Sequence, residues 1–217
     1  MGGSFCAGMA AALLLGGCEL IDLHPQVSQP GQLDRPFAVS NFFTPSGYMG
    51  DGARLGQLKA DVLNETCKTR PPGATGDCYR FIYYPSASMW AGVYWVYPAN
   101  NWGSRAGRLI AGPRFKRVRL QAASATPDLL INFLVGGIND PTLPNRDRVS
   151  AVTSLRLGTD WQTVTLDVSD QDFDHVIGAL AWSLPYPEGW DGERPVVFYL
   201  DDVVWDTEDG SASGAAP

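Results

Sequence analysis

Trp and Tyr side chains are concentrated in residues 90–103, where they make up five of fourteen positions. Strand-forming residues over 92–97, followed by the turn residues Pro-Ala-Asn-Asn, predict a β-strand. A strand alternates its faces, which gives two sets of side chains: Val93, Trp95 and Tyr97 on one side, and Tyr94 and Val96 on the other. One set fills a core. The other set then presents flat rings to a ligand, unless both faces of the strand are covered.

Residues with acid–base or nucleophilic chemistry show no catalytic signature. A hydrolase would need two carboxylates across a cleft, one of them with a raised pKa. The available acids are Asp51, Glu65, Glu188 and Asp201, and no sequence motif pairs any two of them. His24 and His175 lie in segments without other chemistry, and there is no Gly-x-Ser-x-Gly motif. The sequence therefore favours a non-catalytic protein and keeps a hydrolase as an alternative.

The glycine-rich segment 44–52 lacks both the Lys of a P-loop and the glycine spacing of a dinucleotide fingerprint, so nucleotide binding is disfavoured. Asp51 in this segment is either a cation ligand or a brace for the loop.

Cysteine usage points to an exported chain. If Cys6 is removed with a leader and Cys18 is lipidated, Cys67 and Cys78 are the two that remain. They enclose a short turn-rich segment, and we expect a disulfide between them. The alternative, a metal-binding pair, lacks the usual short Cys/His spacing and other local ligands.

The N-terminal residues have the form of a bacterial lipoprotein leader. Residues 1–17 carry no charge, and the apolar run over 9–15 is too short to span a bilayer. Leu15-Gly-Gly-Cys18 matches a lipobox, in which cleavage precedes a Cys that is then lipidated. The leader lacks the usual Lys or Arg, so a plain secretory signal and a coincidental apolar N-terminus stay open. Glu19 resembles the sorting position of enterobacterial lipoproteins, which implies the outer membrane of a bacterial cell envelope.

Composition and turn signals predict one all-β domain. The 217 residues, with 24 Gly and 16 Pro, suit a single core with many turns, and the net charge of −7 disfavours nucleic acid. We expect a leader over 1–17, a tether over 18–35, a domain over 36–206 and a disordered tail over 207–217. Eight to ten short strands form a β-sandwich or jelly roll. The expected strands cover 36–43, 78–84, 92–97, 114–123, 129–137, 152–157, 161–168, 176–182 and 195–205. Residues 44–52 and 139–149 are expected as loops, 169–174 as one helical turn, and 55–63 as a short helix or an irregular segment.

Three segments of the second half, 161–168, 172–182 and 198–205, resemble carbohydrate-binding modules of the galactose-binding-like jelly-roll superfamily. In that superfamily a structural calcium often ties a terminal Asp to the opening strand or loop. The resemblance therefore implies a calcium site, with Asp201 and Asp202 matching the motif and Asp51 and backbone carbonyls completing it. The alternative is that one Asp is solvated and the other braces a loop.

The resemblance and the aromatic residues together predict a non-catalytic lipoprotein, expected as a monomer, that binds a polysaccharide or oligosaccharide. Sugar rings stack on Trp and Tyr, and their hydroxyls need polar partners. The predicted platform is Trp95, Tyr97 and Trp182, and the predicted polar partners are Arg119, Gln121 and Asn132. Trp102 and Trp190 lie in loops, where they either rim a cleft or cover the end of the sandwich.

Two alternatives to this platform stay open. The rings fill the core and Arg119 lies on a solvated face, or the chain is an envelope scaffold whose aromatics form a protein interface.

Overall fold

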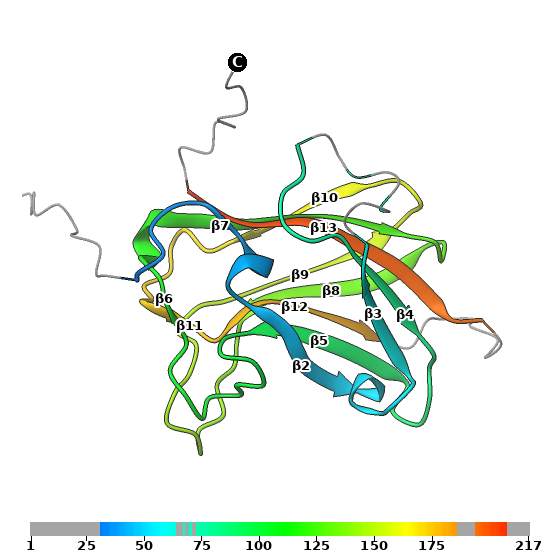
Figure 1. Ribbon diagram of the computed structural model, residues 1–217, viewed down its shortest axis with the longest axis horizontal. Coiled ribbons are helices and arrows are strands. Elements are labelled where there is room, and N and C mark those ends of the chain that lie inside the picture. Colours follow the sequence, from blue (N-terminus) through cyan, green and yellow to red (C-terminus); the bar gives the residue numbers. More distant parts are fainter. Residues whose placement is uncertain (1–30, 64–66, 68–69, 71–72, 186–193, 208–217) are drawn as a thin grey trace, which may run out of the picture.

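The computed structural model describes residues 31–63, 67, 70, 73–185 and 194–207, which form two antiparallel sheets packed face to face (Figure 1). Sheet I, the upper sheet in Figure 1, has the order β10-β7-β13-β4-β3, and β1 also pairs with β13. Its strands are β10 (Gln162–Asp167), β7 (Phe115–Ser124), β13 (Val196–Thr207), β4 (Tyr79–Tyr83), β3 (Leu58–Val62) and β1 (Phe37–Ala38).

Sheet II, the lower sheet, has the order β2-β5-β12-β8-β9. Its strands are β2 (Thr44–Gly50), β5 (Trp90–Val96), β12 (Gly178–Pro185), β8 (Leu129–Gly136) and β9 (Ser150–Leu157). The short strands β6 (Arg108–Leu109) and β11 (His175–Val176) pair at one end of the sandwich. The described residues also contain the single-turn 3₁₀ helices η1 (Val39–Asn41), η2 (Asp51–Ala53) and η4 (Gly112–Arg114). The predicted all-β jelly-roll sandwich is confirmed.

The core between the sheets comes from the alternation of side chains along each strand. In β4, Tyr79, Phe81 and Tyr83 are buried while the residues between them are half-buried. Trp182 of sheet II packs edge-on against Phe81 and Phe198 of sheet I, with ring centroids 5.0 and 4.8 Å apart. These interlocked rings hold the two inner faces together.

A second, smaller apolar cluster lies on the outer face of sheet II. Its buried members are Tyr94, Val96, Ile138, Ile177 and Ala181. The loops 97–107 and 137–149 extend below sheet II at its left end in Figure 1, where they cover this cluster. The outer face of sheet II is therefore covered at one end and open over the rest.

The predicted strands differ from the observed ones mainly near the N-terminus. Residues 36–43 form only the two-residue β1 and the turn η1, whereas 44–50, expected as a loop, form the edge strand β2. Pro45 is tolerated there because an edge strand leaves N–H groups unpaired, and a bulge lies between Pro45 and Gly47. The undecided residues 55–63 contain strand β3, and the expected helical turn over 169–174 is irregular.

The predicted disulfide is confirmed: Cys67 and Cys78 are bonded, with Cα atoms 6.4 Å apart. The domain begins before Pro36, because Leu33, in the predicted tether, pairs with Ile110 and bonds through its backbone to Leu109 and Ala111. No helix among the described residues is both long and apolar enough to cross a membrane. The predicted leader, Cys18, His24, Glu65, Glu188, Trp190 and all of the tail beyond Thr207 lie outside the described residues.

Candidate functional site

The outer face of sheet II carries a row of five residues that crosses all five strands, and three of the five have polar side chains. The strand registers place Met49, Gly92, Ser183, Asn132 and Ser154 side by side, one from each of β2, β5, β12, β8 and β9. We call these five residues the polar row. Since paired residues of an antiparallel sheet share a face, all five point away from the core.

The polar row is hydrogen bonded but keeps capacity for further bonds. Ser154 Oγ donates to Asn132 Oδ1 at 2.6 Å, and Asn132 Nδ2 donates to Ser183 Oγ at 3.2 Å. An amide has two donor hydrogens and two acceptor lone pairs, and a hydroxyl donates once and accepts twice. The three side chains therefore offer both donors and acceptors to a ligand that lies on them.

Trp90 stands at one side of the polar row, at the start of β5, and is 40% exposed. The segment that leads into it is fixed by Asp51, which is fully buried. Asp51 accepts hydrogen bonds from the backbone N–H groups of Ser86, Ser88 and Met89 at 2.7–3.1 Å, and from the Tyr83 hydroxyl at 2.9 Å. Burial alone would raise the pKa of Asp51, but these donors together hold it below its usual value.

Trp102 stands at the other side of the polar row and is 37% exposed. Its ring meets Tyr94 edge-on at 5.7 Å and lies over Gly47, where a Cβ would be only 3.1 Å from the ring. The loop that carries Trp102 is organised by the fully buried Asn101. Asn101 donates to the carbonyls of Tyr97 and Arg105 and accepts from the N–H groups of Gly103 and Arg105.

The second loop, 137–149, is fixed by Asp147. Its carboxylate accepts from the backbone N–H groups of Ile138, Ile177 and Gly178 at 2.6–3.2 Å. Burial raises the pKa of Asp147 to about 6, and the three N–H donors oppose that rise. This loop supports the first one, because Asn145 N and Nδ2 both donate to the Gly103 carbonyl. Trp102 is therefore held by two braced loops.

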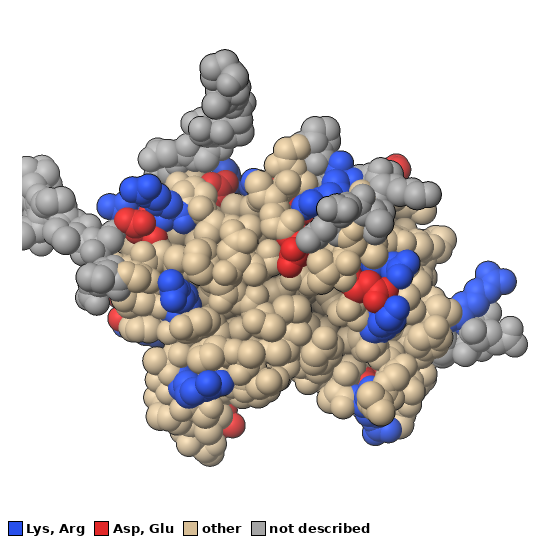
Figure 2. Space-filling model, in the orientation of Figure 1, with Lys and Arg blue, Asp and Glu red and all other residues tan. Residues whose placement is uncertain are grey.

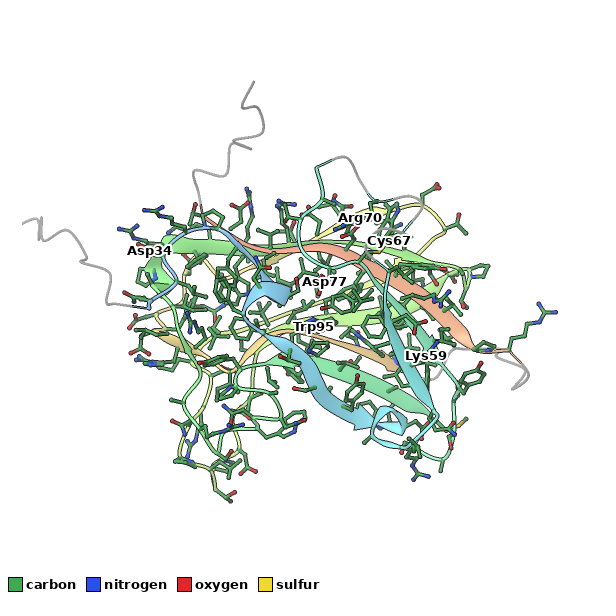
Figure 3. The ribbon with its side chains drawn as sticks, viewed as in Figure 1. Asp34, Lys59, Cys67, Arg70, Asp77 and Trp95 are labelled. Carbon is green, nitrogen blue, oxygen red and sulfur yellow. A yellow bond between two sulfur atoms is a disulfide. The ribbon has the colours of Figure 1, made fainter. Side chains whose placement is uncertain are left out.

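Two of the predicted platform rings are unavailable to a ligand. Trp95 is 1% and Trp182 0% exposed, and both lie between the sheets, as Figure 3 shows for Trp95. The prediction was wrong here because alternation separates two faces without saying which one is buried. Tyr97 lies past the end of β5, half-buried against Phe43, with the Arg108 guanidinium 5.5 Å from its ring.

The predicted polar partners do not come together either. Arg119 and Gln121 lie on the outer face of sheet I, where Arg119 pairs with Asp202 and Gln121 donates to Thr163. Asn132 lies in the polar row of sheet II. Strands β7 and β8 are neighbours in sequence but belong to different sheets, so a single adjoining patch was wrong.

The three aspartates expected to bind calcium do not converge on one site. Asp51 contacts Tyr83 at one end of β4, whereas Asp201 directly follows Leu200, which pairs with Tyr79 at the other end. Asp201 accepts two bonds from Arg70 at 2.8 Å, and Asp202 accepts from Thr75 and Arg119. These residues do not fit a shared calcium ion; Asp51 is the loop brace of the alternative reading, and neither Asp201 nor Asp202 is a solvated carboxylate.

Cys67, Cys78 and Asp201 also have donor atoms within 4.8 Å of one another. Both sulfurs are held in the disulfide, so they are not available as thiolate ligands.

Of the four acids named for the catalytic alternative, Asp51 and Asp201 lie in the described residues. Both are fully buried and hydrogen bonded, at opposite ends of β4, so they do not form a pair across a cleft. Asp128, beside the outer face of sheet II, pairs with Arg156 at 3.0 Å.

Sequence reasoning missed the roles of three residues that build this surface: Trp90, Asn101 and Asp147. Trp102 was expected in a loop, either at the rim of a cleft or over the end of the sandwich, and the structure places its ring over Gly47 and against Tyr94. A signal was present for Trp90, which belongs to the aromatic stretch and begins β5. For Asn101 and Asp147 the bonding partners come from tertiary structure, and no local pattern marks them.

Comparisons with known proteins find only distant likenesses. No protein-family profile and no curated protein matches the chain. Among solved structures, the family 30 carbohydrate-binding module of a cellulosomal cellulase of Clostridium thermocellum aligns with 77% of this chain and 95% of its own, at 16% identity and a TM-score of 0.47. The family 11 module of Clostridium thermocellum, in complex with a β-1,3-1,4-mixed-linked tetrasaccharide, covers 76% and 98% at 12% identity and a TM-score of 0.41.

An exo-β-agarase matches 79% of this chain over 24% of its own length, at 8% identity and a TM-score of 0.47. Likenesses at this distance do not say which side chains bind a ligand, so the function is inferred below from the residues of the chain itself.

Proposed function

We propose that this chain is a non-catalytic carbohydrate-binding protein and that the outer face of sheet II is its binding surface. The observation that carries the proposal is the placement of two part-exposed indole rings, Trp90 and Trp102, on either side of the polar row. Trp90 and the residue beneath Trp102, Tyr94, are four residues apart on β5, which corresponds to about 13 Å along a strand. A chain of sugar rings spans such a distance.

The chemistry of this surface suits a sugar. The apolar faces of pyranose rings stack on indole, and their hydroxyls need neutral groups that both donate and accept. The polar row supplies such groups through Ser183, Asn132 and Ser154. The braces at Asp51, Asn101 and Asp147 fix the surface before a ligand arrives, which lowers the entropy cost of binding.

The cellular context follows from the N-terminal motif. We place the protein in the bacterial envelope, anchored through a lipid on Cys18, and expect it to be a monomer. Bacterial production with radiolabelled palmitate tests the anchor: label on the wild type that is absent from Cys18→Ser supports it, and an unlabelled wild type contradicts it.

A protein-binding role is the second candidate, because Leu130 and Val152 add exposed apolar surface, 37% and 67%, to the same face. A partner protein whose binding is lost in the Leu130→Gln and Val152→Gln variants but kept in Trp90→Ala would favour the protein-binding role over glycan binding.

An array of neutral and acidic polysaccharides tests the main proposal, with the full chain carrying Cys18→Ser so that no lipid is attached. We expect binding that Trp90→Ala and Trp102→Ala each weaken by about tenfold or more, the free energy of a buried aromatic contact. The matched control is Trp161→Ala, since Trp161 packs against Tyr199 of sheet I. No binding to any polysaccharide, or equal loss in the Trp161 variant, contradicts the proposal.

A further inference from the structure

A second surface hollow lies far from the polar row, beside the point where the described chain begins and ends. It has a volume of about 440 Å³ and is lined by Asp34, Arg35, Pro36, Pro113, Arg114, Lys116 and Thr207. We call it the basic hollow. Its location is marked by Asp34 at the upper left of Figure 3, and Lys and Arg gather in the same region of Figure 2.

Three cations and one carboxylate line the basic hollow, although the whole chain has a net charge of −7. Asp34 lies 3.8 Å from Arg114. Within the described residues, neither Arg35 nor Lys116 forms an ion pair. The hollow therefore carries positive charge that the described chain does not neutralise.

Two nearby acids bear on this charge. Asp206 pairs with Arg117 at 3.0 Å. Asp167, on the strand beside β7, accepts a hydrogen bond from Ser169 N at 2.8 Å and interacts electrostatically with Lys116. The hollow keeps a net positive charge, since its three cations face only Asp34 and Asp167 among these acids.

The backbone segments that carry the cations are fixed side by side. Leu33 N donates to the Leu109 carbonyl at 3.0 Å, and Ala111 N donates to the Leu33 carbonyl at 2.8 Å. Arg35 follows two residues later, and Arg114 ends the turn η4 just after Ala111. Lys116 is the second residue of β7, the strand between β10 and β13, and its carbonyl accepts a hydrogen bond from Val168 N at 2.9 Å. The cations are thus presented by paired backbone and not by free loops.

We propose that the basic hollow binds a phosphate group, either of an anionic phospholipid headgroup or of a soluble phosphate ester. Guanidinium and ammonium groups are the usual phosphate ligands, through forked and point-charge bonds respectively. The described chain begins at residue 31, thirteen residues after Cys18, and Asp34 and Arg35 of the hollow follow directly, so the lipid anchor proposed above keeps the start of the domain within about 45 Å of a membrane. The phosphate site does not depend on glycan binding, which we propose for the outer face of sheet II.

Vesicle sedimentation with the full chain carrying Cys18→Ser tests the proposal. We expect binding to vesicles of mixed phosphatidylglycerol and phosphatidylcholine, weaker at high salt, and none to phosphatidylcholine alone. The double variant Arg35→Gln, Lys116→Gln should lower the partition coefficient by about thirtyfold, at roughly 1 kcal/mol for each cation removed. Its matched control is Arg54→Gln, Lys59→Gln, which removes the same charge at the far end of the molecule, where Figure 3 labels Lys59.

A second arm titrates inorganic phosphate and glycerol phosphate against the same proteins, with chloride at equal ionic strength as reference, and follows NMR signals of Arg35 and Lys116. Shifts with phosphate but no vesicle binding assign the site to soluble esters; vesicle binding lost only in the Arg35, Lys116 variant assigns it to lipid. Neither kind of binding, or equal loss in the Arg54, Lys59 control, overturns the proposal. Glycan binding by all variants stays unchanged in each case, which separates this test from that of the polar row.

Discussion

The two outer faces of the sandwich differ in the charge of their polar side chains and in how those side chains are paired. Four Arg–Asp pairs lie on or beside the outer face of sheet I: Arg70 with Asp201, Arg80 with Asp61, Arg117 with Asp206 and Arg119 with Asp202. Charged atoms accordingly gather along the upper edge of Figure 2, over this sheet. On sheet II the side chains at the centre are neutral, and two indole rings stand beside them.

This difference separates a face that is internally satisfied from one that has spare bonding capacity. On sheet I a sugar hydroxyl would compete for donors and acceptors that the ion pairs already use. The polar row has donors and acceptors that its own hydrogen bonds leave unused. The tests below probe this contrast.

Removing the carboxylate that braces Trp90 should have the largest effect. Asp51→Ala leaves three backbone N–H groups and the Tyr83 hydroxyl without their acceptor, so we expect a loss of about 3–5 kcal/mol in the free energy of unfolding. Urea denaturation measures it. The matched variant on sheet I, Asp61→Ala, breaks part-exposed pairs with Lys59 and Arg80 and should cost under about 1 kcal/mol. Equal losses in the two variants would contradict the brace.

Asp147 should give the covering loops a dependence on pH. Its pKa is raised from 3.8 to about 6 by burial, so the folded state binds a proton more readily than the unfolded state. The contribution of Asp147 to stability is therefore greatest below the unfolded pKa and is lost as the pH rises through about 6.

The difference in unfolding free energy between wild type and Asp147→Asn isolates this group, because other carboxylates contribute equally to both proteins. On lowering the pH from about 7 to about 4 we expect the difference to rise by about 2 kcal/mol in favour of wild type. A difference that stays constant, or falls, would show that the three N–H donors outweigh burial.

Loosening the loop under Trp102 should reduce glycan binding more than stability. Asn101→Ala removes four bonds that shape the loop, and we expect glycan affinity to fall by about tenfold as Trp102 loses its position. Isothermal titration calorimetry with a glycan identified on the array measures it. A variant that binds as tightly as wild type would remove Trp102 from the site.

The smallest effect is expected on sheet I. Arg119→Gln breaks the pairs with Asp202 and Asp206. Because the Arg119 side chain is 34% exposed, the free energy of unfolding should fall by no more than about 1 kcal/mol. Glycan affinity should not change. A tenfold loss of glycan binding in this variant would move the site to sheet I and restore the predicted role of Arg119.

The fold was predicted well because turn signals separate short runs of strand-forming residues. Strands such as β4 and β10 also alternate in burial, whereas β5 and β12 are buried on both faces. The main exception is β2, where Pro45, Gly47 and Gly50 read as loop residues, yet pairing with β5 makes a strand. Local preference was overridden there by tertiary hydrogen bonding. The disulfide was predictable because Cys67 and Cys78 enclose a short, turn-rich segment, whereas the other two cysteines lie near the N-terminus.

The site was predicted poorly for a physical reason. Alternation assigned Trp95 and Tyr94 to opposite faces, but which face meets the other sheet depends on all the strands at once. The choice of Trp95 and Trp182 took the two rings that pack the core. Of the six predicted sugar-binding residues, only Asn132 lies on the candidate surface. Its hydrogen-bonding neighbours Ser183 and Ser154 come from other strands, so no local sequence pattern marks them.

The most direct test of the central claim is an NMR titration of the full chain, carrying Cys18→Ser, with the glycan that binds best on the array. Amide, side-chain amide and indole N–H signals report each face separately. We predict that the shifts cluster at Trp90, Trp102, Asn132 and Ser183 and spare Arg119, Gln121 and Thr163. Shifts centred on the outer face of sheet I, or spread evenly over both faces, would contradict the assignment of the binding surface to sheet II.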